Sequence, residues 1–228
     1  MFDDEPKSLE ESLVATLART DLRDTITELS EVGLDALFDD GVARDVPIIG
    51  TLFSLASGVM TIRDRLFAKK VLRFLAALDD IPREERQAQI DHMAADPKER
   101  RRIGEQLILL LDRLNDMGKP ALLAKAFQAF LKDQIERAQF QALANAIDGI
   151  LPENVGIFKS RMDARGRIHD RESDDATANF MQCGLVVLKL EDIDTTARWG
   201  DGSVTLARPG YYATSRLGSL FYEIVLKN

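Results

Sequence analysis

The segment from Val46 to Ile62 constrains the fold of this chain most, because it holds seventeen consecutive residues without a charged side chain. A membrane-spanning helix usually needs about 20 apolar residues, whereas this run is shorter and is interrupted by glycine, serine and threonine. The basic segment RDRLFAKKVLRF follows directly. We therefore expect a central helix buried in protein, and we predict that Leu52, Phe53, Leu55 and Val59 are buried.

Three small residues recur at helical spacing in this run. Gly50, Ser54 and Gly58 fall at positions i, i+4 and i+8, so that one face of the helix is nearly bare and lets another backbone approach closely. We expect this face to form a close helix contact inside the molecule. Two alternatives stay open: the face is a dimer interface, or the helix can be released to enter a membrane.

The composition is that of a folded protein with a core of its own. Of the 228 residues, 45% are hydrophobic and 30% are charged, which is near the norm for globular chains. The single cysteine, Cys183, excludes a disulfide within the chain. The first residues lack the cationic and apolar pattern of a signal peptide, so we expect a cytoplasmic protein.

The net charge of -8 is concentrated near the beginning of the chain. Residues 1–46 hold 4 basic and 13 acidic side chains, whereas residues 47–151 hold 16 and 14. In the second segment Arg65, Lys69 and Arg73 fall at i, i+4 and i+8 and form a cationic stripe. Three interpretations compete: a solvated surface, a dock for the acidic N-terminal arm, or a contact for anionic lipid or nucleic acid.

Helical periodicity dominates as far as residue 151. Asp21 is a candidate cap for a helix that runs to Phe38, and Pro47 suits the first turn of the uncharged helix. Asp96 is followed by a proline and an acid in the pattern of a helix start, and Gly118 is expected to end that helix. The core stripes expected in this region comprise Phe67, Val71, Phe74, Leu75, Leu78, Ile103, Leu107, Leu110, Leu111 and Leu114. The sequence thus predicts a mainly α fold with a multi-helix body over residues 1–151.

Beyond Pro152 the pattern changes to short strand-like runs. We predict a helix capped by Ser173, a strand over residues 185–190, its hairpin partner over residues 203–206 and a terminal helix capped by Thr214.

Two segments in this part resemble the end of winged-helix domains: Gly184-Leu185-Val186, and Tyr212-Ala213-Thr214-Ser215-Arg216-Leu217-Gly218. The resemblance implies a small winged-helix-like α+β subdomain over residues 152–228, in which residues 173–183 would be the recognition helix.

The charges of this helix do not suit DNA binding. It begins Ser173-Asp174-Asp175 and contains no Lys or Arg, and acids at its start repel phosphate. Arg198 and Arg208, on the predicted wing, are the remaining candidates for nucleic-acid contact. We therefore expect this subdomain to serve packing or protein contact and keep DNA binding as the alternative.

A second resemblance is carried by Pro47-Ile48-Ile49-Gly50 and the following IRDRLFAKKVLRFL. This pattern resembles a group of uncharacterised bacterial helical proteins that are associated with phages and mobile elements. The resemblance covers about residues 30–150 and implies a prophage or phage-defence context. It brings no catalytic residue.

Catalytic patterns are missing from the sequence. His92 and His169 stand alone, without the spacing of a metal site, and the chain has no glycine-rich phosphate loop or GxSxG turn. We expect no enzyme activity, cofactor, metal or small-molecule substrate. The sequence predicts an interaction protein that acts through helix packing and self-association as a homo-oligomer. A winged-helix DNA-binding regulator and a membrane-perturbing effector that uses the Val46–Ile62 helix are the alternatives.

Overall fold

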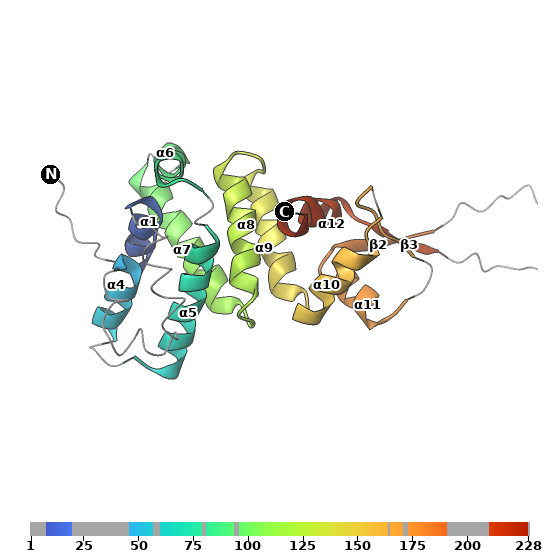
Figure 1. The fold of residues 1–228 in the computed structure, drawn as a ribbon, viewed down its shortest axis with the longest axis horizontal. Helices are drawn as coiled ribbons and strands as arrows, with labels where there is room; N and C mark the ends of the chain where they lie inside the picture. The colour runs from blue at the N-terminus through green and yellow to red at the C-terminus, as the bar shows by residue number, and fades with distance from the viewer. Residues whose placement is uncertain are drawn as a thin grey trace, which may run out of the picture. The chain divides into compact units, whose positions relative to one another are not determined.

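The computed structural model describes residues 8–19, 46–56, 60–78, 81–93, 96–163, 165–170, 173–190 and 210–227 (Figure 1). The chain divides into two compact units, which are Met1–Phe140 and Gln141–Asn228, and we call them unit 1 and unit 2. This division falls inside a helix, whereas the boundary predicted near residue 152 falls at the start of the next one.

Unit 1 is built from helices, as the sequence predicts for a mainly α fold. Its described helices are α1 (Leu9–Arg19), α4 (Pro47–Leu55), α5 (Ile62–Ala77), α6 (Arg83–Met93), α7 (Pro97–Arg113) and α8 (Lys119–Leu131), and it contains the start of α9 (Arg137–Gly149). Helix α1 packs against α4, α6 and α7, and α5 packs against α7 and α8. The aromatic core of the unit joins Phe74, Phe127 and Phe140, with ring centroids 5.7 and 5.8 Å apart.

The uncharged run does not form one long helix. Helix α4 ends at Leu55, and α5 begins at Ile62 with a capping box between Thr61 and Asp64. Among the described residues, no helix combines the length and the apolar character needed to cross a membrane.

Two of the four burial predictions for this run are confirmed, one is wrong, and one lies outside the described residues. Leu52 and Phe53 are buried, but Leu55 is 67% exposed, and Val59 is not described. The register of α4 against α1 explains the exposure of Leu55. Thr16 contacts Ile48 and Ser12 contacts Thr51, so the two helices run antiparallel and Leu55 falls level with the first residues of α1.

A hydroxyl from α1 caps α4. The residue before α4, Val46, has no side chain that can cap a helix, and Thr16 Oγ1 instead accepts a hydrogen bond of 3.1 Å from the backbone N–H of Ile48. The hydroxyls of Ser12 and Thr51 lie 2.6 Å apart. Because both contacts are internal, they stabilise the docking of α4 on α1.

Helix α7 begins as predicted and ends earlier than predicted. The Asp96 carboxylate caps it by accepting from Lys98 N–H, and Ile103, Leu107 and Leu111 are buried, while Leu110 is half-buried. The prediction that Gly118 ends α7 is wrong, because the helix stops at Arg113 and Gly118 is the cap of α8. The loop between them is held by Asp116, which accepts from Gly118 N–H at 2.6 Å.

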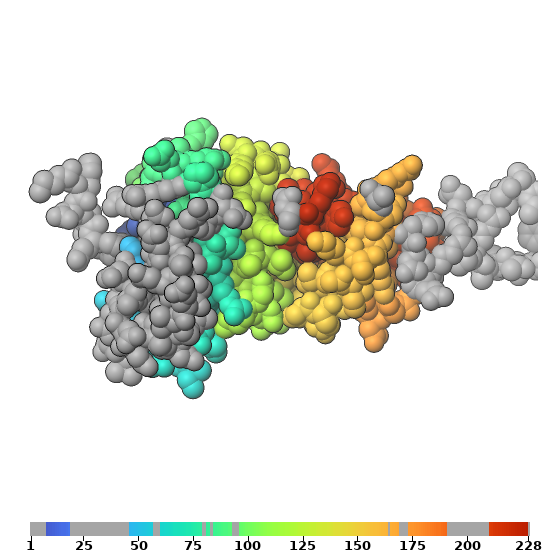
Figure 2. Space-filling model, viewed as in Figure 1, coloured from blue at the N-terminus to red at the C-terminus, as the bar shows by residue number. Residues whose placement is uncertain are grey.

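Unit 2 combines short helices with a small sheet. Its described elements after α9 are α10 (Pro152–Arg161), β1 (His169–Asp170), α11 (Asp175–Gln182), β2 (Val186–Lys189), β3 (Tyr211–Thr214), α12 (Arg216–Phe221) and the π-helical turn η2 (Tyr222–Leu226). The strands are antiparallel in the order β1-β3-β2. Phe158 meets Phe180 and Phe221 edge-on, and the red C-terminal helices lie directly against the orange-yellow segment that contains α10 (Figure 2).

The helix caps in unit 2 are shifted by one residue from the predicted ones. Asp174, not Ser173, caps α11, and Ser215, not Thr214, caps α12. Thr214 is instead the last residue of β3, and its hydroxyl accepts from Ile168 N–H at 2.5 Å. The predicted partner strand over residues 203–206 lies outside the described residues. In the structure β2 pairs with β3, with Val186 opposite Thr214 and Lys189 opposite Tyr211.

Candidate functional site

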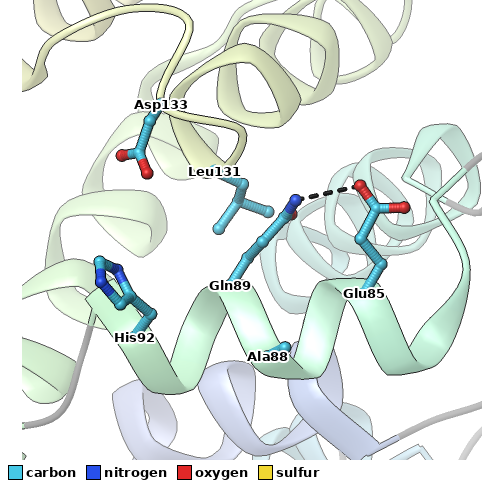
Figure 3. A pocket seen from close by; sticks show the side chains of 6 residues that line it. All are labelled: Glu85, Ala88, Gln89, His92, Leu131 and Asp133. Carbon is cyan, nitrogen blue, oxygen red and sulfur yellow. Dashed lines mark hydrogen bonds between the residues drawn. The ribbon is translucent and has the colours of Figure 1, made fainter.

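A hollow between α6 and the end of α8 is a candidate binding site within unit 1 (Figure 3). Its volume is about 400 Å3, and it is lined by Glu85, Ala88, Gln89 and His92 of α6 and by Leu131 and Asp133 of α8 and its following turn. The four residues of α6 fall at i, i+3, i+4 and i+7, which places them on one face of that helix.

Gln89, one of the lining residues, carries an unsatisfied acceptor. Its Nε2 donates to Glu85 Oε1 at 3.1 Å, a bond that Figure 3 shows along α6. This bond orients the amide, and Gln89 Oε1 is left buried without a hydrogen-bond partner in the described part of the chain. An unsatisfied buried acceptor costs about 1–3 kcal/mol, and buried polar atoms are rarely left in this state.

The end of α8 brings Asp133 to the other side of the hollow. Asp133 has φ 52°, in the left-handed region that few residues other than glycine adopt. The chain closes the helix there, because Asp133 N–H donates to Phe130 O at 3.1 Å and Gln134 N–H donates to Ala129 O at 2.9 Å. In Figure 3 the Asp133 carboxylate faces the same space as the His92 ring.

The lining of the hollow is rich in acceptors. Glu85 and Asp133 supply carboxylates, the Gln89 amide oxygen lies covered behind the surface, and none of the six lining residues is Lys or Arg. The C-terminal end of α8 adds the negative end of a helix dipole. Within the described residues, no group of three His, Cys, Asp or Glu side chains is placed to hold a metal ion. The hollow therefore suits a hydrogen-bond donor with positive charge.

The cations of α5 serve in part to hold the fold together. Arg73 donates to the Met117 carbonyl at 2.7 Å, and Lys70 donates to the Asp112 carbonyl at 2.8 Å. Asp112 lies in the last turn of α7, where backbone carbonyls lack helical partners, and Met117 lies in the loop just before Gly118, the cap of α8. Of the predicted stripe, Arg65 and Arg73 are exposed and Lys69 is half-buried. The acidic arm that this stripe was predicted to dock, residues 1–46, lies mostly outside the described residues, so the dock stays a prediction.

The small-residue face of α4 is only partly described. Gly50 is half-buried, and Ser54 is exposed with its hydroxyl donating to the Gly50 carbonyl at 3.1 Å. Gly58 lies outside the described residues, so close packing along Gly50, Ser54 and Gly58 stays a prediction. The side of α4 that is buried consists of Ile48, Ile49, Leu52 and Phe53.

In unit 2, Arg161 of α10 is bonded to the start of α11. Arg161 forms a two-pronged ion pair with Asp174 and donates to the Thr177 hydroxyl at 2.9 Å. The guanidinium holds the pKa of the Asp174 carboxyl well below its usual range, and it lies 5.8 Å from the centre of the Phe180 ring. Arg198 and Arg208, the predicted nucleic-acid contacts, lie outside the described residues.

The outward surface of unit 2 is apolar and acidic at α11 and β2. The exposed residues within α11 are Asp175, Ala178, Met181 and Gln182. On β2, Val187 and Leu188 are 40% and 47% exposed, and the following Leu190 is 77% exposed. The helix offers no cation to a phosphate, and the strand offers exposed apolar side chains next to one exposed cation, Lys189.

Sequence reasoning missed two buried polar residues that organise the fold. Arg86 lies in the polar run REERQ, which is typical of a helix surface, yet it is buried. Asn179 is also buried; its side chain accepts from Leu151 N–H at 3.0 Å and donates to the Gly149 carbonyl at 3.1 Å. In the sequence, only the neighbouring apolar Phe180 indicates that Asn179 could be buried. Nothing in the sequence indicates the burial of Arg86.

Comparison of the chain with protein-family models, with curated proteins and with solved structures gave no match.

Proposed function

We propose that this chain is a non-enzymatic interaction protein that associates with another protein, in the simplest case a second copy of itself, through the apolar surface of unit 2. The observation that carries this proposal is the exposure of Val187, Leu188 and Leu190 on and directly after β2. Leu188 and Leu190 share one side of the chain because side chains alternate along a strand, and neighbouring exposed apolar groups mark contact surfaces in folded proteins.

The position of β2 in the sheet supports a contact made by strand addition. In the order β1-β3-β2, β2 is an edge strand, since β3 is its neighbour and no other described strand pairs with it. The backbone groups on such an edge can bond to a strand from another chain. Because side chains alternate along a strand, Val187 and Leu188 face opposite sides, so an added strand would cover apolar groups on both.

The charge of α11 argues for a protein partner over nucleic acid. Its exposed residues include Asp175 and no cation, and Arg161 is engaged by Asp174. Phosphate binding depends on unpaired Lys and Arg at the contact. A cytoplasmic location and a prophage or phage-defence context stay predictions, the latter because of the resemblance of residues 30–150.

The test compares two matched double variants by light scattering over a range of protein concentrations. Val187→Thr with Leu190→Ser removes apolar surface from unit 2, and Ile62→Thr with Leu66→Ser removes exposed apolar surface from α5 in unit 1. We expect the first pair to raise the dissociation constant of the self-association about tenfold or more and the second pair to leave it unchanged. Circular dichroism checks that both variants are folded.

Three results would contradict the proposal. A wild-type chain that stays monomeric at all concentrations excludes self-association, and an effect confined to the Ile62 and Leu66 variant moves the contact to unit 1. Binding of duplex DNA that weakens steeply with added salt would favour the DNA-binding regulator instead.

A further inference from the structure

We propose that the hollow between α6 and α8 binds a small organic cation, namely a primary ammonium or guanidinium group on a short alkyl chain. The hollow belongs to unit 1 and shares no residue with the apolar surface of β2. The inference is therefore independent of the proposed self-association, and each can fail without the other.

The charge of the lining selects for a cation. Glu85 and Asp133 approach the hollow from two different elements, α6 and the turn after α8. Both side chains are exposed at its mouth. The last turn of α8 ends at Leu131, so the negative end of its dipole points to the same region. An anionic ligand would meet these groups without a compensating Lys or Arg in the lining.

The hydrogen-bonding capacity of the lining selects for a donor. Gln89 Oε1 is an acceptor without a partner, whereas the amide nitrogen of the same side chain is already bonded to Glu85. An ammonium group has three N–H donors and a guanidinium group has five, and neither has an acceptor. A small movement of the Gln89 side chain would let one of these donors reach the covered oxygen.

The size and the walls of the hollow suit a short alkyl chain. Its volume of about 400 Å3 lies at the low end of the range of small-molecule sites, about 300–1,000 Å3. Ala88 and Leu131 provide apolar contacts between the acceptor groups, and the His92 ring forms a further wall (Figure 3). A diamine of four carbons supplies two ammonium groups, and the methylenes that join them can lie against Ala88 and Leu131.

The experiment is a titration of the 15N-labelled full-length chain with 1,4-diaminobutane, followed by amide chemical shifts. We expect saturable shifts at residues 85–92 and 131–133 with a dissociation constant below about 10 mM. Sodium chloride at equal ionic strength controls for screening, and 1,4-butanediol controls for a neutral ligand of the same length. N-acetyl-lysine amide and agmatine distinguish a protein-borne lysine and a guanidinium from a free diamine.

Three variants test whether the lining residues of the hollow contribute to binding, and a fourth variant is the control. Asp133→Asn keeps a residue that tolerates the left-handed conformation, Glu85→Gln keeps the acceptor for Gln89, and Gln89→Met removes the unsatisfied oxygen at similar length. Each should weaken binding about threefold or more. Glu84→Gln neutralises an exposed acid on the same helix that does not line the hollow, and it should change the affinity less than about twofold.

Three results would overturn the inference. They are the absence of saturable shifts with every cation, equal shifts with butanediol, and equal weakening of binding by Glu84→Gln. Binding of N-acetyl-lysine amide alone would support the site and assign its ligand to a protein side chain.

Discussion

At the scale of single residues, the Arg86 side chain donates hydrogen bonds to backbone carbonyls of two separate segments. Its Nε donates to the Leu17 carbonyl at 2.6 Å, and its Nη1 donates to the Leu78 and Ile81 carbonyls at 3.5 and 3.4 Å. Leu17 lies in the last described turn of α1 and Leu78 directly follows α5, and carbonyls at helix ends need partners from outside the helix. A single buried guanidinium thus joins α1, α5 and α6.

Replacing Arg86 should therefore destabilise unit 1 strongly. We expect Arg86→Ala to lower the free energy of unfolding by about 2–4 kcal/mol, because the Leu17 and Ile81 carbonyls lose the Arg86 donor and a cavity is left. Urea unfolding with an unchanged m-value measures this loss. The exposed Arg65→Ala should stay within about 0.5 kcal/mol of the wild type. A loss below about 1 kcal/mol for Arg86→Ala would mean that these carbonyls find other donors.

At the scale of elements, the contact between α12 and the start of β2 explains why glycine occupies positions 184 and 218. Gly184 has φ 73°, which glycine adopts without strain, and Ser215 N–H donates to the Leu185 carbonyl at 2.9 Å. A Cβ atom on Gly218 would lie 2.0 Å from that carbonyl oxygen. The glycine is therefore required because α12 begins directly against the backbone of Leu185.

Two glycine-to-alanine changes in unit 2 should have opposite effects. Gly218→Ala should lower the free energy of unfolding by about 2 kcal/mol or more, since the clash is with backbone. Gly156→Ala lies in α10 with open space around the added atom, so it should raise stability by about 0.5–1 kcal/mol through helix propensity. Thermal unfolding of the two variants shows whether each change lowers or raises stability. A Gly218→Ala variant as stable as the wild type would show that α12 can move away from β2.

The cap of α11 predicts a dependence of stability on pH. The Arg161 guanidinium, followed by hydrogen bonds from Thr177, lowers the pKa of Asp174, so the folded value lies below the unfolded one of about 3.9. The stabilisation is complete above about pH 5 and is lost as the pH falls through the folded value.

The variant Asp174→Asn removes the ion pair with Arg161 and keeps the helix cap, because asparagine also caps helices well. We expect it to cost about 0.5–1 kcal/mol at pH 7, the size of an exposed pair, and progressively less below pH 4. Unfolding by urea at pH 7, 4 and 3 gives the comparison. Asp175→Asn, which removes a charge from the same turn, should stay within about 0.5 kcal/mol at every pH; the same pH dependence in both variants would refute the role of Asp174.

At the scale of the whole molecule, each unit has its own core and its own candidate surface. Phe74, Phe127 and Phe140 form the aromatic cluster of unit 1, and Phe158 joins Phe180 and Phe221 in unit 2. The acceptor-rich hollow belongs to the first unit and the apolar edge strand to the second. Self-association and amine binding should therefore respond to different substitutions, which the two experiments above measure directly.

Local chemistry explains which features could be predicted from the sequence. The mainly α fold, the start of α7 at Asp96 and the buried stripe of Phe67, Val71 and Phe74 all depend on residues that are neighbours along a helix. The early end of α7 could not be predicted, because Gly118 is equally suited to end one helix or to precede the next. A shift of one residue at Asp174 and Ser215 has the same cause, since adjacent side chains compete to cap one helix.

The amino-acid sequence by itself determined where helices form and which of their faces are apolar, because spacing and capping act over a few residues. The tertiary structure alone decided the exposure of Leu55, the burial of Arg86 and the hollow beside Gln89. Each of these depends on a partner far along the chain: the register of α1 against α4, the carbonyl of Leu17, and the turn after α8. Contacts of this kind arise only when separate helices meet, so that no local pattern in the sequence records them.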